Sequence, residues 1–206
     1  AEAGMAVPPE PVVFGKWTSC IVGPDDTIEI PRGSVKTDWE VELGVVIGQG
    51  GRYIEERDAM AHVAGYCVVN DVSEREYQIE RGGQWTKGKS DATFGPVGPW
   101  LVTKDEIPDV QKLSMWLDVN GQRRQTGSTS TMIFSMAKCI SYVSQFMTLL
   151  PGDVIINEFL AENVNQLLDE DGEPQDWIEL RNRGTNSVNL LGWSLTDEAS
   201  LPGKWV

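Results

Sequence analysis

The sequence predicts an α+β fold in which short strands outnumber helices. Apolar, β-branched runs of strand length recur along the chain, and turns rich in glycine, proline, aspartate and asparagine separate them. Helical periodicity is clear in one long segment only. The ranges in which we expect strands are 18–22, 39–47, 63–70, 97–103 and 113–119.

The other elements follow from local signals. The prolines in residues 7–14 exclude a helix and predict an extended entry into the first strand. Asn120-Gly121 predicts a tight hairpin turn. We expect helices at 55–62 and 131–150, and Pro151-Gly152-Asp153 should end the second one. The apolar residues expected on the buried face of that helix are Ile133, Met136, Ala137, Ile140, Val143, Phe146 and Met147.

The chain is acidic, with a formal net charge of −14 over 206 residues. A surface of that sign argues against nucleic acid or an anionic membrane as a partner. No apolar run approaches the roughly 18 residues that a membrane-spanning helix needs. Residues 156–206 hold ten acidic and three basic side chains, so this last quarter carries half of the charge. That asymmetry predicts a domain boundary after residue 155.

Cysteine and histidine are scarce. Cys20, Cys67 and Cys139 are widely spaced in apolar or small-residue contexts, so we expect reduced, packed thiols and no disulfide framework. His62 is the single histidine, and we expect its side chain to be packed or half-exposed. A Ser-His-Asp or Cys-His mechanism is therefore hard to build within this chain.

Three carboxylates stand out in apolar surroundings. Glu40 and Glu42 lie two residues apart in a buried-strand pattern, so their side chains should point to the same face. Asp71 comes where another apolar strand gives way to polar residues. Oxygen ligands without nearby histidine or cysteine suit a hard divalent ion rather than zinc. The alternative is an amphipathic edge strand with two solvated glutamates, and the pattern alone leaves both open.

Seven separate blocks in the first three quarters of the chain resemble the fumarylacetoacetate hydrolase family. The tryptophan-rich sequence of these blocks is most similar to the branch that hydrolyses 2,4-diketo-3-deoxy sugar acids. It is also similar to ureidoglycolate lyases and to homoprotocatechuate-pathway isomerases. The matching blocks are Phe14-Gly-Lys-Trp-Thr-Ser19, Ile30-Pro-Arg-Gly-Ser34, Asp38-Trp-Glu-Val-Glu-Leu-Gly-Val-Val-Ile-Gly48, Gly65-Tyr-Cys-Val-Val-Asn-Asp-Val-Ser-Glu-Arg75, Gly83-Gln-Trp-Thr-Lys-Gly-Lys-Ser90, Phe94-Gly-Pro-Val-Gly-Pro99 and Gln145-Phe-Met-Thr-Leu-Leu-Pro-Gly-Asp153.

The resemblance implies a mixed β-roll with few helices, in a cytoplasmic, metal-dependent hydrolase that forms a homodimer through this core. It implies that Glu40, Glu42 and Asp71 bind one Mg²⁺ or Mn²⁺ ion, with Ca²⁺ as an alternative. The substrate would be a small 2-oxo or 2,4-diketo acid whose C–C bond is cleaved. The residues that it places around this substrate are Arg75, Gln78 and Lys89.

In the reaction that the resemblance implies, Lys89 stabilises the enolate that leaves when water attacks the chelated substrate. The family's general base is a His-x-x-Glu pair on a lid. Glu2 matches the glutamate and would be catalytic, whereas the histidine has no counterpart because the sequence begins inside this motif. Loss of a general base typically costs roughly 10²–10⁴-fold in rate, so we expect impaired hydrolysis. Isomerase, decarboxylase or ureidoglycolate lyase activity is the alternative within the family.

From residue 155 on, the sequence resembles a second family, the lamin-tail domain. Its members are non-catalytic interaction modules often found on exported proteins. We therefore expect a hydrolase-like core truncated at both ends in residues 1–155. Residues 156–206 would be a partial, unclosed immunoglobulin-like β-sandwich, joined to the core by a fusion or by the assembly of two gene fragments. A binding module is the rival function. The matching blocks are Ile155-Ile-Asn-Glu-Phe-Leu-Ala161, Leu168-Asp-Glu-Asp-Gly172, Asp176-Trp-Ile-Glu-Leu180, Leu190-Leu-Gly-Trp-Ser-Leu-Thr-Asp197 and Lys204-Trp205.

Overall fold

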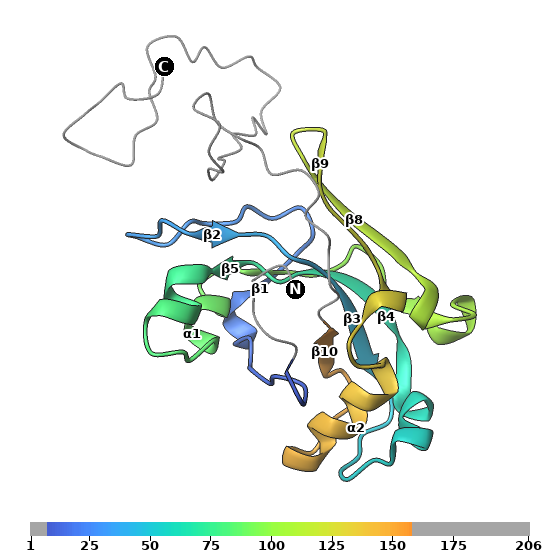
Figure 1. The fold of residues 1–206 in the computed structure, drawn as a ribbon. Coiled ribbons are helices and arrows are strands. Elements are labelled where there is room, and N and C mark those ends of the chain that lie inside the picture. The colour runs from blue at the N-terminus through green and yellow to red at the C-terminus, as the bar shows by residue number, and fades with distance from the viewer. Residues whose placement is uncertain (1–7, 158–206) are drawn as a thin grey trace, which may run out of the picture. The chain divides into compact units, whose positions relative to one another are not determined.

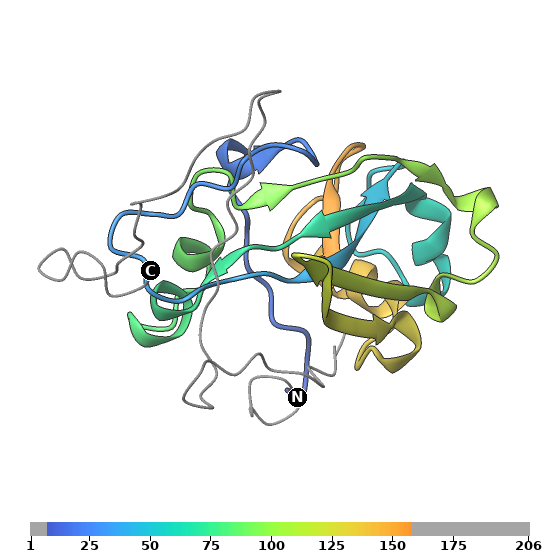
Figure 2. The same cartoon turned by 90° about the horizontal axis from the view of Figure 1, so that it is seen from above.

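A four-stranded antiparallel sheet organises residues 8–157, the part of the chain that the computed structural model describes (Figure 1). Two long strands, β3 (Val41–Ile47) and β4 (Val63–Asn70), form its centre. The edge strand β10 (Val154–Asn157) pairs with β3, and the edge strand β7 (Val102–Thr103) pairs with β4. Figure 2 shows these strands side by side from above.

The strand β3 is buried on both faces, and β4 is buried at most of its positions although Val68 is 49% exposed, which explains why their sequences are apolar runs rather than strict alternations. The close fit requires a glycine in β3. A Cβ atom on Gly44 would lie 2.6 Å from Cys67 Sγ and 2.9 Å from Val69 Cγ2. Gly44 therefore allows the side chains of β4 to fill the space above the neighbouring strand.

One face of the sheet carries the main hydrophobic core. Val41, Leu43, Val45 and Ile47 project from it, as expected from the alternation of β3. The helix α2 (Met136–Phe146) packs against this face and lies far from the short helix α1 (Thr86–Lys89) in both views (Figure 1, Figure 2). The hydroxyl oxygen of Ser135 caps α2, because it accepts a hydrogen bond from Lys138 N at 3.1 Å.

Three strand pairs complete the described sheets. The pair of β2 (Thr37–Asp38) with β5 (Ser73–Glu74) is antiparallel, whereas that of β1 (Ile21–Val22) with β6 (Gly95–Pro96) is parallel. The strands β8 (Ser114–Val119) and β9 (Gln122–Ser128) form a hairpin. Asn120 and Gly121 both have positive φ, 52° and 74°, as its two-residue turn requires.

Short helical turns connect these strands, and one of them, η3, has π-helical geometry. The turns are η1 (Thr18–Cys20), η2 (Glu56–His62), η3 (Glu76–Glu80), η4 (Lys104–Glu106), η5 (Val110–Lys112) and η6 (Thr129–Thr131). No helix within residues 8–157 is both long and apolar enough to cross a membrane.

Several predicted elements are confirmed, and three need correction. The strand at 63–70 and the Asn-Gly hairpin are confirmed, and the strand at 39–47 begins two residues later than expected. The strand predicted at 97–103 is wrong over its first five residues, because Gly98 adopts φ 117° and Pro99 has no N–H to donate. The first half of the strand predicted at 18–22 is a helical turn.

The helix predicted at 131–150 is shorter, because Ser135 caps its start and its last residue is Phe146. Met136 and Ile140 are buried as predicted, whereas Ile133, Phe146 and Met147 are exposed. The predicted lamin-tail-like segment lies outside the described residues beyond Asn157, so that prediction stays untested.

Candidate active site

The site lies where β3 begins and β4 ends. Glu40 directly precedes β3 and Asp71 directly follows β4, so the antiparallel register brings these two residues together. The amide of Asp71 donates to Glu40 O at 2.8 Å, which continues the ladder by one step. Beyond this point the same two segments of the chain pair again as β2 and β5. Both carboxylates are buried, with 6% and 2% of their surfaces exposed.

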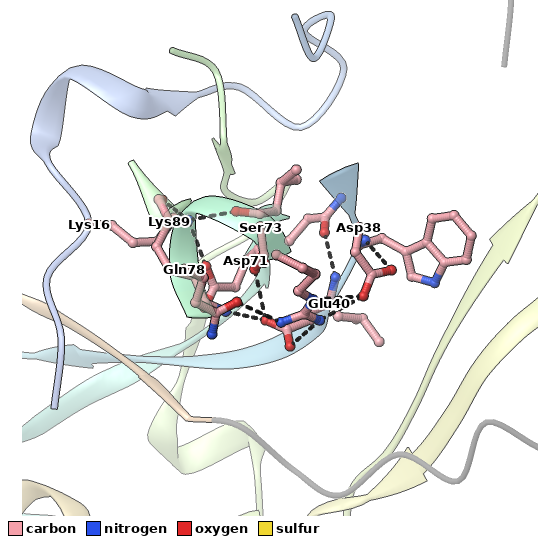
Figure 3. A network of polar contacts seen from close by, with 12 residues as sticks. Lys16, Asp38, Glu40, Asp71, Ser73, Gln78 and Lys89 are labelled. Carbon is pink, nitrogen blue, oxygen red and sulfur yellow. Dashed lines mark hydrogen bonds and ion pairs between the residues drawn. The ribbon is translucent and has the colours of Figure 1, made fainter. Parts of the chain in front are cut away.

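Lys89 supplies the cation at the centre of the site (Figure 3). Its ammonium group donates to Glu40 Oε2 and, at 2.9 Å, to Asp71 Oδ2, and the residue is 2% exposed. Gly88 allows α1 to approach closely enough for these contacts. A Cβ atom there would lie 2.5 Å from Gln78 N, so no other residue fits without displacing the backbone.

A second buried lysine, Lys16, holds Asp71 from the other side. Its Nζ lies 2.6 Å from Asp71 Oδ1 and also donates to the carbonyl oxygens of Val72 and Lys89. All three hydrogens of the ammonium group are thus used, so Lys16 clamps the carboxylate and the end of α1 together. The sequence block around Lys16 matches the family, but the spacing of 55 residues gives no sign of this pair.

Arg75 is held by two carboxylates and one amide. Its Nε and Nη2 donate to Asp38 Oδ2 at 3.0 and 2.7 Å, and Nη2 also donates to Glu40 Oε1 at 2.7 Å. Nη1 donates to Gln78 Oε1 at 3.1 Å. One N–H of Arg75 therefore remains for a ligand, and so does the amide nitrogen of Gln78, which has no hydrogen-bond partner within residues 8–157.

The charges in the site determine its protonation. Burial by itself would raise the pKa of Glu40, but the charges of Lys89 and Arg75 outweigh it, and the pKa lies below its ordinary value. For Lys89, burial alone would lower the pKa, whereas Glu40 and Asp71 raise it above the usual range. The site therefore contains an ionised carboxylate and a charged ammonium group at neutral pH.

The predicted metal ligands are only partly assembled. Oxygens of Glu40 and Asp71 converge on one point, where the ammonium nitrogen of Lys89 lies. Glu42 is 1% exposed and shares the Glu40 face of the strand. Within residues 8–157, however, no group of three acidic, histidine or cysteine side chains has the arrangement of a ready metal site. The donor chemistry fits a hard divalent ion, and the point of convergence already attracts a cation.

The structure thus brings together five of the residues predicted for the site, Glu40, Asp71, Arg75, Gln78 and Lys89. Glu2 lies outside the described residues. His62 is half-exposed, as expected, and its backbone pairs with Gly48 at the opposite end of β3, roughly 20 Å from the site. Sequence reasoning missed Lys16, Asp38 and Ser73. The hydroxyl of Ser73 donates to Glu40 Oε2 at 3.2 Å. The Val-Ser-Glu-Arg motif after Asp71 was the only sequence signal that could have indicated its place in the site.

Comparison with known proteins gives a consistent family match. Residues 1–157 match the family model described as fumarylacetoacetate (FAA) hydrolase C-terminal. A protein of Burkholderia lata named "Putative hydrolase" is 68% identical over 155 residues, which cover 75% of this chain and 55% of that protein. The chain therefore spans about half the length of the curated relatives that it matches.

Solved structures have the same fold. That of 5-carboxymethyl-2-hydroxymuconate delta-isomerase from Mycobacterium smegmatis matches with a TM-score of 0.70 and 35% identity, over 78% of this chain and 63% of that chain. That of 2-hydroxyhepta-2,4-diene-1,7-dioate isomerase from Mycobacterium marinum matches with a TM-score of 0.71 and 39% identity, over 75% and 60%. The predicted α+β fold with few helices is therefore confirmed for residues 8–157.

Proposed function

This chain belongs to the fumarylacetoacetate hydrolase family, and from that premise we propose that it cleaves a small 2,4-diketo acid with one divalent ion bound. The observation that carries the proposal is the ammonium group of Lys89, buried between Glu40 and Asp71. A charged donor held in place away from water can stabilise an enolate as it forms. Since the chain spans part of its relatives, the activity of the whole protein belongs to the proposal.

Glu40, Glu42 and Asp71 would hold the divalent ion, Mg²⁺ or Mn²⁺. When bound there, such an ion supplies Lewis-acid polarisation of the substrate's oxo groups. The proposal rests on the donor chemistry of three buried carboxylates, two of which already converge on a cation. A bound ion would compete with the Lys89 ammonium group for the oxygens of Glu40 and Asp71. The ammonium group would then be available to the substrate.

The other polar groups would orient the substrate. The remaining N–H of Arg75 and the amide nitrogen of Gln78 can both donate to a substrate carboxylate. In hydrolysis, the oxygen of water bonds to the C4 carbonyl carbon and the C3–C4 bond breaks. The electron pair passes into the enolate of a 2-oxo acid, which Lys89 stabilises by hydrogen bonding and which then takes up a proton at C3.

Isomerisation of a 2-hydroxy-2-enoic acid is the second candidate, and two of the similar proteins favour it because they are named isomerases. This reaction moves a proton from the 2-hydroxyl group to a carbon and consumes no water. It needs the proton-transferring capacity of Lys89 and no lid base.

An assay with acetylpyruvate and Mn²⁺ tests the proposal. We expect pyruvate and acetate in equal amounts, and loss of their formation in Lys89→Met. Lys87→Met is the matched control, because Lys87 is an exposed neighbour on α1 whose ammonium group, within residues 8–157, donates to the carbonyl of Arg81. Equal rates in Lys89→Met and the parent protein would exclude the proposed role. Ketonisation of a 2-hydroxymuconate without cleavage would assign the isomerase activity instead.

Three finer assignments are part of the same proposal. The substrate branch would be the 2,4-diketo-3-deoxy sugar acids, the assembly would be a homodimer through the core, and the compartment would be the cytoplasm. The lamin-tail-like segment would add a binding surface rather than a catalytic residue. Each rests on the resemblance of the sequence to these families.

A further inference from the structure

A cavity of about 390 Å³ lies on the sheet face opposite the active site. Tyr66 of β4 forms part of its lining and pairs with Val45, which projects into the core, whereas Glu42 projects from the other face of β3. The cavity therefore shares no wall with the carboxylate cluster. Its volume falls within the usual range for small-ligand pockets. The apolar side chains in its lining are Met60, Ile107, Pro108, Val110, Met136 and Ala137.

Tyr66 brings an unpartnered donor to this cavity. The residue is 5% exposed, yet its hydroxyl forms no hydrogen bond with any other residue in the range 8–157. Burial raises the pKa of Tyr66, so the hydroxyl stays protonated at neutral pH and can donate. The hydroxyl oxygen itself is not among the fully enclosed unpaired atoms of residues 8–157, so it is open to the cavity that Tyr66 lines and can donate to a ligand acceptor there.

The first turn of α2 adds further donors. Met136 N is used by Gln111 Oε1 at 2.8 Å, and Lys138 N by the Ser135 cap. The amide of Ala137, which lines the cavity between them, has no acceptor among the described residues. The positive end of an eleven-residue helix thus faces the same space as Tyr66.

The charged side chains in the lining favour an anion. Lys104 lies there with its ammonium group 3.5 and 3.3 Å from the carbonyl oxygens of Met60 and Ala61, near the limit of hydrogen bonding. Asp109, the acidic residue of the lining, is neutralised by Lys112 at 2.7 Å and accepts from Gln111 N. The cationic charge of Lys104 is therefore not cancelled within the lining.

We propose that this cavity binds a small organic anion, a carboxylate attached to an apolar or aromatic body. The carboxylate would accept hydrogen bonds from Tyr66 and Ala137 and lie near Lys104. The apolar body would contact the methionine, isoleucine, proline and valine side chains of the lining. This site is independent of the proposed reaction, because none of its lining residues belongs to the carboxylate cluster.

Benzoate is a suitable probe, with neutral benzamide as its isostere, and amide NMR of the full chain is the readout. We expect saturable benzoate binding that shifts the Ala137 resonance, and weaker binding of benzamide. Tyr66→Phe and Lys104→Gln should each weaken benzoate binding roughly fivefold, as loss of one hydrogen bond or charge contact predicts. Tyr66→Phe keeps the ring and Lys104 is exposed, so both variants should fold.

Lys138→Gln is the matched control, because this exposed lysine is one residue beyond Ala137 and does not line the cavity. Its binding of benzoate should equal that of the parent protein. Three results would overturn the proposal: no saturable binding, equal weakening in Lys138→Gln, or shifts that map to Arg75 and Lys89 instead of Ala137.

Discussion

Lys16 and Asp71 form a buried ion pair, with 2.6 Å between Nζ and Oδ1, although 55 residues separate them in the sequence. Lys16 also donates to the carbonyl of Lys89. Its side chain therefore connects the segment that precedes β1 to the end of β4 and to α1. This clamp fixes both the carboxylate and the lysine on which the proposed chemistry depends.

Replacing Lys16 by methionine should destabilise the fold strongly. Among the described residues Asp71 would keep the hydrogen bond from Lys89, so the loss should not exceed the about 3–5 kcal/mol that is typical when a buried charge is left unpaired. Urea unfolding measures this loss. Lys36→Met is the control, because the Lys36–Glu80 pair is exposed, and little change is expected there. Similar stabilities of the two variants would show that the clamp is not structural.

Replacing Lys89 by methionine should make folding more dependent on divalent ions. The variant leaves Glu40 and Asp71 facing one another without the ammonium group between them. Two neighbouring carboxylates repel each other, and a cation relieves the repulsion. Thermal unfolding with and without Mn²⁺ should therefore show a larger increase in Tm for this variant than for the parent. An equal or smaller increase would argue against a cation site at this point.

Replacing Gly44 by alanine should destabilise the sheet by about 1–3 kcal/mol, the usual cost of overpacking a core. The new methyl group would lie 2.6 Å from Cys67 Sγ. Combining it with Cys67→Ala should recover part of the loss. Gly15→Ala is the control, because a Cβ there meets nothing within 4 Å. Chemical denaturation of the four proteins checks this, and absence of any recovery would mean that the thiol is not the obstacle.

The thiols of Cys67 and Cys139 should react slowly in the native protein. Burial raises the pKa of both, so less thiolate forms in the folded state at a given pH. Between pH 7 and 9 the unfolded chain should be alkylated increasingly fast, while the native chain stays at least about tenfold slower. Mass spectrometry after iodoacetamide treatment, with and without urea, measures both rates. Equal rates in the two states would refute the predicted burial.

The sequence predicted the central ladder well because local pattern determines it. The apolar run at 63–70 is a strand of that length, and two neighbouring strands made it reasonable that Glu40 and Asp71 would meet. The boundaries of α2 were less accessible, since the Ser135 cap competes with the apolar periodicity that continues past both of its ends.

The partners within the site could not be predicted, because they are long-range. Arg75 was expected to bind a substrate carboxylate, yet most of its donors point to Asp38 and Glu40 of the chain itself. Lys16 shows the same limit, as no local pattern links it to Asp71. Sequence motifs identified the residues of the site, and only the fold shows which of their charges neutralise one another.

The central claim is that Glu40, Glu42 and Asp71 bind one divalent ion, and isothermal titration with Mn²⁺ tests it most directly. We expect one saturable site per chain in the parent protein. Binding should be lost in Asp71→Asn and in the double variant with Glu40→Gln and Glu42→Gln, provided that circular dichroism shows both to be folded. Absence of binding to the parent protein, or undiminished binding to the folded variants, would contradict the account.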